Sequence, residues 1–105
     1  QSYHSIMKSY CDMKGFLTFL ILRMISKKNM SGEEISKEIE KRKGCRPSPG
    51  TIYPVLKNLR EGNLIKEIKN KSKEKKYEIT TKGEKELTIA VKKFISIFFD
   101  MKEEF

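Results

Sequence analysis

The segment RPSPGTIYPVLKNLREGNLI, residues 46–65, constrains the fold most, because it places prolines and glycines inside a helical pattern. Ser48 can cap a helix here, Pro49 suits the first helical position, and Gly62 suits the end. Apolar residues recur at spacings of three and four, which predicts one buried face: Ile52, Val55, Leu56 and Leu59. The segment therefore predicts a helix over residues 48–61.

Pro54 lies about one and a half turns inside this helix, where a proline removes a hydrogen bond and crowds the preceding turn. Its missing N–H would have reached back only to Gly50, and Gly50 has no Cβ to crowd the proline ring. We therefore expect the helix to continue through Pro54.

Two further helices are predicted before this segment. Residues 13–28, MKGFLTFLILRMISKK, are apolar on almost every side, which indicates burial by the domain and also by a second subunit. In residues 30–44, MSGEEISKEIEKRKG, Ser31 and Glu34 form a capping box and Gly44 suits the end of the helix. The apolar stripe of this second helix consists of Ile35 and Ile39.

After residue 62 the pattern changes to two short strands and one long helix. The strands flank residues 69–76, KNKSKEKK, which hold five Lys and one Glu. Thr81 and Glu84 form a second capping box, which predicts the start of the last helix. That helix carries a seam of coiled-coil type, with steps of four, three, four and three: Leu87, Val91, Phe94, Phe98 and Met101.

Three helices followed by a β-ribbon are typical of a winged helix-turn-helix. The predicted fold class is mainly α with a small β-ribbon, a winged helix-turn-helix with an added long C-terminal dimerisation helix. We expect an N-terminal extension at residues 1–12, the DNA-binding domain at 13–81 and the dimerisation helix at 82–105. The first two residues resemble the remnant of an expression tag.

The charge distribution indicates an anionic partner. The formal net charge is +9 and the pI is about 9.6. Residues 82–105 hold five Lys and five acidic residues, so the whole excess lies in residues 1–81. A basic body joined to a neutral, apolar helix predicts one surface for double-stranded DNA and another for protein.

The predicted helix at 48–61 turns its N-terminal end and its outward side to DNA. Free N–H groups there, with the hydroxyls of Ser48 and Thr51, can hold phosphate. Tyr53 and Lys57 can reach one strand, and Pro54 can meet a thymine methyl group. The alternative is a solvated helix face with Tyr53 packed sideways.

Lysines of the predicted hairpin tip supply further DNA contacts: Lys71, Lys73 and Lys75. Lys14 and Arg46 are weaker candidates for phosphate contact. Contacts of this kind give affinity and salt dependence rather than sequence choice. The alternative is an ordinary solvated turn.

The apolar seam of the last helix predicts a two-fold dimer, because large aromatic side chains left in water are a liability. The expected dimer residues come from the first and last helices: Phe16, Leu20, Leu87, Val91, Phe94, Ile95, Phe98 and Met101. The alternative is that this side folds back on its own domain.

Other function classes find little support in the sequence. No phosphate loop, catalytic triad or carboxylate pair is visible, so we expect no enzyme and no cofactor. His4 and Cys11 have no second pair of metal-ligand spacing, so no metal site is expected. Cys11 and Cys45 predict free thiols in a cytoplasmic protein, with one bridge left open, and no apolar stretch is long enough to span a membrane.

The chain resembles the PadR-like transcriptional regulators from Lys14 to about Thr81. KGFLTFLIL is similar to the family's opening helix and MSGEEISKEIE to its second helix. RPSPGTIYPVLKNLREGNLI is similar to its recognition helix, and KKYEITTKGEKEL to its second wing strand and the start of its dimerisation helix. The resemblance implies a homodimeric repressor on a palindromic promoter site, with the last helix packed on the partner's first helix. It also implies a DNA-reading set of Ser48, Thr51, Tyr53, Pro54 and Lys57.

Three departures from the family pattern stand out. The wing has NKSKEKK where the family often has arginine-rich residues, which implies a lysine-based wing. Glu33 stands where an aromatic residue is usual. The chain has no Trp, the residue with which some relatives bind flat aromatic compounds, so a plain seam is favoured over an effector site at Phe94 or Phe98. A small hydrophobic or aromatic effector stays an alternative, as does a winged-helix module that binds protein or RNA.

Overall fold

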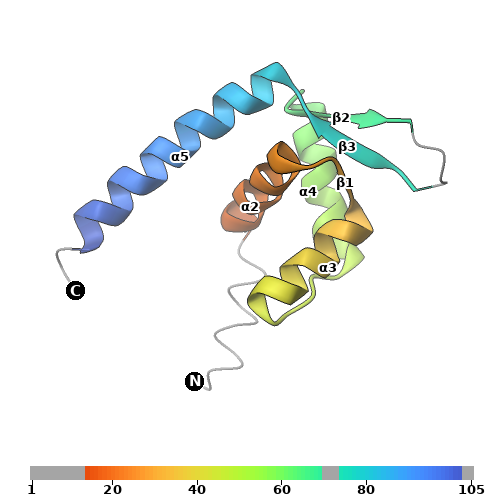
Figure 1. Cartoon of the computed structure of the whole chain (residues 1–105), viewed down its shortest axis with the longest axis horizontal. Helices are drawn as coiled ribbons and strands as arrows, with labels where there is room; N and C mark the ends of the chain where they lie inside the picture. Colours follow the sequence, from red (N-terminus) through yellow and green to blue (C-terminus); the bar gives the residue numbers. More distant parts are fainter. Residues whose placement is uncertain (1–13, 70–73, 103–105) are drawn as a thin grey trace.

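The computed structural model describes residues 14–69 and 74–102 and, within them, leaves out the side chains of Lys14 and Lys43. Its helical elements are α2 (Lys14–Lys27), α3 (Gly32–Lys43), α4 (Pro49–Glu61) and α5 (Thr81–Lys102). Its strands are β1 (Met30–Ser31), β2 (Ile65–Ile68) and β3 (Lys76–Ile79). This order confirms the predicted fold class, and Figure 1 shows three packed helices, a β-ribbon to one side and a long last helix. The expected extension at residues 1–12 lies outside the described residues.

The sheet is antiparallel with the strand order β1-β3-β2. Ile65 lies opposite Ile79 across the β2–β3 ribbon, and Met30 lies opposite Tyr77 across β1–β3. Strand β1 was not predicted from the sequence, because a two-residue strand is too short to show alternation. This third strand fixes the ribbon to the start of α3.

The core lies where α2, α3 and α4 meet the inner side of the ribbon. Ile21, Ile35 and Ile52 are completely buried, and Tyr77 closes the core from β3. The predicted buried face of α4 is confirmed in full, because Ile52, Val55, Leu56 and Leu59 are all buried. Pro54 is exposed inside a continuous helix, which confirms the expectation that α4 tolerates it.

The ends of α4 lie where they were predicted, with Ser48 at the N-cap and Gly62 at the C-cap, but their bonds and backbone angles differ from expectation. Ser48 occupies the N-cap position, but its side chain makes no capping bond; its hydroxyl lies 3.2 Å from that of Thr51 instead. Gly62 has φ −80°, and the left-handed residue is Asn63, with φ 61°. Asparagine tolerates that region better than most residues, so Asn63, directly after the predicted C-cap, adopts the left-handed conformation.

The start of α3 confirms its prediction, whereas that of α5 does not. Both bonds of the Ser31–Glu34 capping box are present, each 3.1 Å long, and Gly44 ends α3 with φ 76°. In α5 the cap is Thr80, whose Oγ1 accepts from the Gly83 N–H at 2.9 Å. The predicted Thr81–Glu84 capping box is therefore wrong, because Thr80 and not Thr81 caps the helix. The Thr80 hydroxyl also donates to Asn63 O, 2.7 Å away in the turn between α4 and β2.

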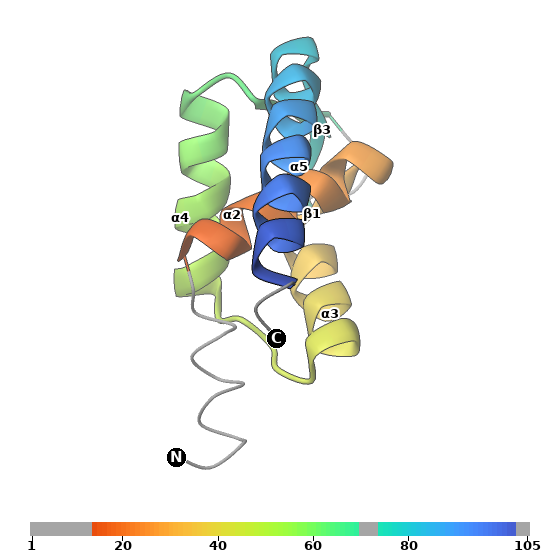
Figure 2. The same ribbon diagram turned by 90° about the vertical axis from the view of Figure 1, so that its left-hand side faces the viewer.

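Helix α5 leaves the domain soon after it begins. Leu87 is buried and Val91 is partly buried against the core, but every described residue from Lys92 onward is exposed. Figure 2 shows α5 crossing in front of the domain, and Figure 1 shows its far end projecting away from it. The aromatic ring of Phe94 stacks on that of Phe19 of α2, with centroids 5.7 Å apart.

Within residues 14–69 and 74–102, no helix is long and apolar enough to cross a membrane.

Candidate nucleic-acid interface

The outward side of α4 presents a mixed aromatic and polar surface. Tyr53 is 50% exposed, and Pro54, Lys57 and Asn58 are exposed beside it. Thr51 is half-buried at the N-terminal end of the helix. The helix presents these residues outward because its opposite side is occupied by the four buried aliphatic residues.

Tyr53 is held against the start of α3. A Cβ built on Gly32 would lie 3.0 Å from Cε1, Cζ and the hydroxyl oxygen of Tyr53. The ring therefore covers Gly32 with one part of its surface and leaves the other part in water. The sideways-packed and the outward-facing alternatives for Tyr53 are both partly correct. The contact between Gly32 and the Tyr53 ring was not predicted from the sequence. Its one local signal was the position of Gly32 inside the Ser31–Glu34 capping box.

The N-terminal end of α4 offers fewer free donors than predicted. Pro49 has no N–H, and the N–H groups of Thr51 and Ile52 both donate to Ser48 O, at 2.9 and 3.1 Å. Gly50 supplies the N–H that remains at this end. An anion bound here would therefore meet one N–H and the two neighbouring hydroxyls of Ser48 and Thr51, rather than a full ring of backbone donors.

Arg46 is engaged within the chain. Its guanidinium donates to Glu33 Oε1 at 2.6 Å, and Lys37 Nζ lies 3.9 Å from the same oxygen. Because Glu33 neutralises part of this charge, Arg46 would attract a phosphate less strongly than an unpaired arginine. Glu33 also stands where the family usually has an aromatic residue. The same departure from the family pattern therefore provides the carboxylate that pairs with Arg46.

The wing lysines lie partly outside the described residues. Lys71 and Lys73 are not described, and the side chain of Lys14 is not described either. Lys75 is exposed, with its Nζ 3.9 Å from Glu67 Oε1. Lys69 is exposed and makes no ion pair with any other described residue. The described part of the ribbon thus carries both charge signs.

The base of the wing is bonded to the start of α3. The buried Ser31 hydroxyl donates to Glu74 Oε1 at 2.7 Å, and Lys76 Nζ lies 3.4 Å from Glu34 Oε1. Partial burial acts to raise the pKa of Glu34, but hydrogen bonds from the Ser31 N–H and Lys76 outweigh it and lower the pKa. These bonds join the wing, β1 and the N-terminus of α3. Sequence reasoning found Glu34 but not Glu74 or Lys76, because long-range partners leave no local pattern.

The predicted dimer residues fall into two groups. Leu87 belongs to the core of its own chain, so it drops out of the expected dimer surface, and Phe16, Leu20 and Val91 are half-buried in the single chain. The remaining predicted residues are about half exposed: Phe94, Ile95, Phe98 and Met101. Ile97 and Phe99 are exposed as well and were not predicted. The alternative that this side folds back on its own domain holds for Leu87 and Val91 and in part for Phe94, whose ring stacks on Phe19, but not for the exposed residues after it.

The expectation of free thiols is wrong for Cys45, which is disulfide-bonded and packs half-buried beside the core. Cys11 and His4 lie outside the described residues.

Comparison with known proteins agrees with this architecture. The model of the Transcriptional regulator PadR-like family matches residues 21–89. A protein of Lysinibacillus sphaericus described as "Uncharacterized protein X" is 31% identical over 91 residues, which are 81% of this chain and 84% of that protein.

Two crystal structures show the same fold. A PadR-like transcriptional regulator from Bacillus cereus has a TM-score of 0.79 and 28% identity, over 87% of this chain and 92% of that one. A PadR family transcription regulator from Clostridium difficile has a TM-score of 0.76 and 30% identity, over 84% of this chain and 96% of that one. The chain therefore belongs to the PadR-like family of transcriptional regulators, which are DNA-binding winged helix-turn-helix proteins and not enzymes.

Proposed function

We propose that this chain is a sequence-specific repressor that binds a palindromic or near-palindromic promoter site as a homodimer in the cytoplasm. The observation that carries the proposal is the outward side of α4, where Tyr53, Pro54 and Lys57 are exposed together in a helix whose other side is buried. An α-helix of this kind fits the major groove, whose base edges distinguish all four base pairs.

Within α4 each outward residue has its own task. The Gly50 N–H and the Ser48 and Thr51 hydroxyls hold one phosphate and so set the depth of the helix in the groove. Tyr53 and Lys57, one turn apart, contact the same strand. Pro54 offers an apolar surface to a thymine methyl group, which gives base preference without a hydrogen bond.

The wing supplies affinity rather than sequence choice. Lys75, with Lys71 and Lys73, contacts the phosphate backbone beside the groove. Arg46 joins them only if it exchanges Glu33 for a phosphate, and Lys14 stays a weaker candidate. Because the wing has lysines where the family often has arginines, binding should depend strongly on salt and weakly on minor-groove width.

The dimer surface consists of the exposed part of α5, namely Phe94, Ile95, Phe98 and Met101, with Phe16 and Leu20 of α2. A lone helix with this many exposed apolar residues is poorly soluble, and a two-fold partner covers it most simply. The rings of Phe94 and Phe98 stack on each other, with centroids 6.4 Å apart and planes 14° apart. This arrangement favours a plain apolar seam over a cavity for an aromatic effector.

Fluorescence anisotropy on the DNA upstream of the protein's own gene tests the DNA proposal. We expect affinity to fall steeply with salt, and the double variant Tyr53→Ala with Lys57→Ala to lose at least about tenfold on this DNA. The control Lys41→Ala removes an exposed lysine from α3, outside the DNA surface. Equal affinity of the double variant and the control for the promoter would refute the assignment of α4.

Absence of any salt-dependent DNA binding would favour the alternative, a winged-helix module that binds a protein or RNA. Sedimentation of the wild-type chain tests the dimer separately. A compact monomer at micromolar concentration would contradict the α5 surface, whatever the DNA result.

A further inference from the structure

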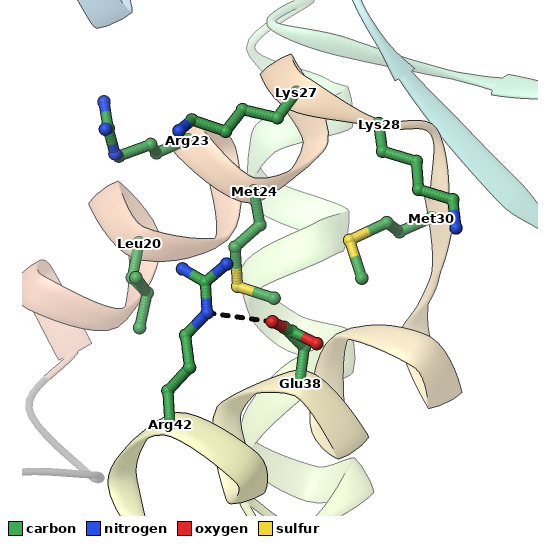
Figure 3. A pocket seen from close by; sticks show the side chains of 8 residues that line it. All are labelled: Leu20, Arg23, Met24, Lys27, Lys28, Met30, Glu38 and Arg42. Atoms are coloured by element: carbon green, nitrogen blue, oxygen red, sulfur yellow. Dashed lines mark hydrogen bonds and ion pairs between the residues drawn. The ribbon is translucent and has the colours of Figure 1, made fainter.

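A small hollow lies between α2 and α3, away from the outward side of α4. Its volume is about 200 Å³. Eight residues line it: Leu20, Arg23, Met24, Lys27, Lys28, Met30, Glu38 and Arg42. Figure 3 shows α2 above it and α3 below it, with the side chains of Met24 and Met30 pointing towards the Glu38–Arg42 pair.

The position of the hollow separates it from the proposed DNA surface. On α3, Glu38 and Arg42 lie on one flank of the buried Ile35–Ile39 stripe, whereas Ser36 lies on the opposite flank. Ser36 packs towards the entry to α4, because its hydroxyl donates to Pro47 O at 3.5 Å. The hollow therefore opens on the side of α3 that faces away from the entry to α4.

The inner wall of the hollow is apolar and adaptable. Met24 and Met30 are buried, at 5% and 9% exposure, and Leu20 is partly buried beside them. Thioether side chains are flexible and polarisable, so they fit apolar groups of several shapes. This wall suits a short hydrocarbon or a single ring.

The rim of the hollow is strongly basic. Arg42 donates from Nε to Glu38 Oε1 at 2.9 Å, which fixes its guanidinium and leaves its two terminal nitrogens without a described partner. The side-chain cations of Arg23, Lys27 and Lys28 make no ion pair with any described residue. The lining thus carries four cations and one carboxylate, an excess of three positive charges, and Figure 3 shows the ends of Arg23 and Lys27 extending along α2 rather than towards Glu38.

We propose that this hollow binds a small amphipathic anion, a carboxylate with a short apolar body. The carboxylate lies between Arg42 and the cations of α2, where a planar guanidinium can hold it by two hydrogen bonds. The apolar body lies against Met24 and Met30. The volume is below the roughly 300–1,000 Å³ of sites for drug-sized ligands, so the ligand is a fragment-sized acid.

The proposal goes beyond the proposed repressor function and does not depend on it. Leu20 also belongs to the proposed dimer surface, but a second copy of the chain is a less suitable occupant of the hollow itself, because the exposed end of α5 is mainly apolar and would bury the three unpaired cations of the rim. A DNA phosphate is also less suitable, because the buried methionine wall gives nothing to a sugar-phosphate backbone.

Methionine-methyl NMR of the whole protein, without DNA, tests the proposal with hexanoate as the probe. We expect the Met24 and Met30 methyl signals to shift saturably with hexanoate while the Met101 signal stays in place. Hexanamide and inorganic phosphate at the same ionic strength should bind at least about tenfold more weakly, because the first lacks the charge and the second the apolar body.

Matched variants localise the effect. Arg42→Gln and Arg23→Gln should each weaken hexanoate binding several-fold, whereas Lys41→Gln, on the exposed side of α3, should leave it unchanged. Equal binding of hexanoate and hexanamide, or equal binding by all three variants, would overturn the proposal. Methyl shifts that follow protein concentration and not hexanoate would overturn it in favour of a partner subunit. Loss of salt-dependent DNA affinity in Arg23→Gln, without hexanoate binding by the wild type, would overturn it in favour of a phosphate contact. Failure of the promoter-binding assay alone would leave the hexanoate result intact.

Discussion

Replacement of Gly83 by alanine should destabilise the chain more than any other exchange of a described glycine for alanine. Gly83 is buried in the first turn of α5, where the helix crosses the start of β2. A Cβ at this position would lie 2.1 Å from Leu64 O and 2.7 Å from Ile79 Cγ1. The first of these atoms belongs to the backbone, so it cannot turn away as the end of a side chain could.

The size of this loss of stability follows from the hydrogen bonds around Gly83 that the new Cβ would disturb. Leu64 O accepts from the Thr80 N–H at 3.0 Å, and the Thr80 hydroxyl caps α5 through the Gly83 N–H at 2.9 Å. Loss of the cap and of one backbone hydrogen bond costs about 1 kcal/mol each, and overpacking adds about 1–3 kcal/mol. The higher helix propensity of alanine offsets at most about 1 kcal/mol. We therefore expect a loss of about 2–4 kcal/mol, a large part of a typical stability of about 5–15 kcal/mol.

Urea unfolding followed by circular dichroism measures this loss, at one fixed protein concentration because the proposed dimerisation would add to apparent stability. Gly15→Ala is the matched control, because a Cβ at that exposed position of α2 meets nothing within 4 Å. The control should be neutral or slightly stabilising. A loss below about 1 kcal/mol for Gly83→Ala would refute the close approach of α5 to β2.

Three further perturbations test the site and the dimer. Gly32→Ala should leave stability nearly unchanged but weaken promoter binding several-fold in the anisotropy assay. The new Cβ would lie 3.0 Å from atoms of the Tyr53 ring and would therefore displace the ring. Unchanged binding would mean that the position of the ring does not matter for DNA binding. Glu34 has a lowered pKa in the folded chain, so its stabilisation is present above its ordinary value of 4.5 and is lost as pH falls through the lowered value. The urea midpoints of wild type and Glu34→Gln should therefore differ at pH 7 and converge in acid. The control variant Glu40→Gln should not show this pH-dependent difference from wild type. A difference between wild type and Glu34→Gln that persists in acid would contradict the ion pair with Lys76. Phe98→Glu should convert the dimer to a folded monomer in sedimentation, because Phe98 is 58% exposed in the single chain, while Ser96→Glu on the opposite side of α5 should stay dimeric.

Local sequence patterns were sufficient to predict the helices and most of their buried faces. The four buried residues of α4 repeat at helical spacing, so their common face could be predicted from the sequence. The Ser31–Glu34 capping box is likewise a bond between neighbours in the chain, and it was predicted correctly. The tolerance of Pro54 was also predicted correctly, but its expected reason was wrong, because a Cβ on Gly50 would meet only Ser48 Oγ, at 3.8 Å, and no atom of the Pro54 ring.

Predictions failed where a distant segment decides the outcome. Thr80 caps α5 in place of Thr81 because its hydroxyl also meets the carbonyl groups of Asn63 and Leu64, 17 and 16 residues away. Strand β1 forms because Met30 pairs with Tyr77 of β3, and Arg46 is engaged because it donates a hydrogen bond to Glu33. None of these partners leaves a periodic signal, so a reading of local sequence could not find them.

The two parts proposed to touch DNA are positioned by one neighbourhood, the start of α3. Gly32 provides the surface on which the Tyr53 ring lies, and the adjacent Ser31 holds the wing through Glu74. Glu34 completes the link by bonding to the Ser31 N–H and to Lys76 of β3. Because the Ser31 side chain is buried and bonds to both Glu34 and Glu74, we expect packing rather than DNA to set the angle between α4 and the wing. The spacing between the proposed groove and backbone contacts would then be present in the free protein, and a change at residues 31–34 should alter both proposed contacts together.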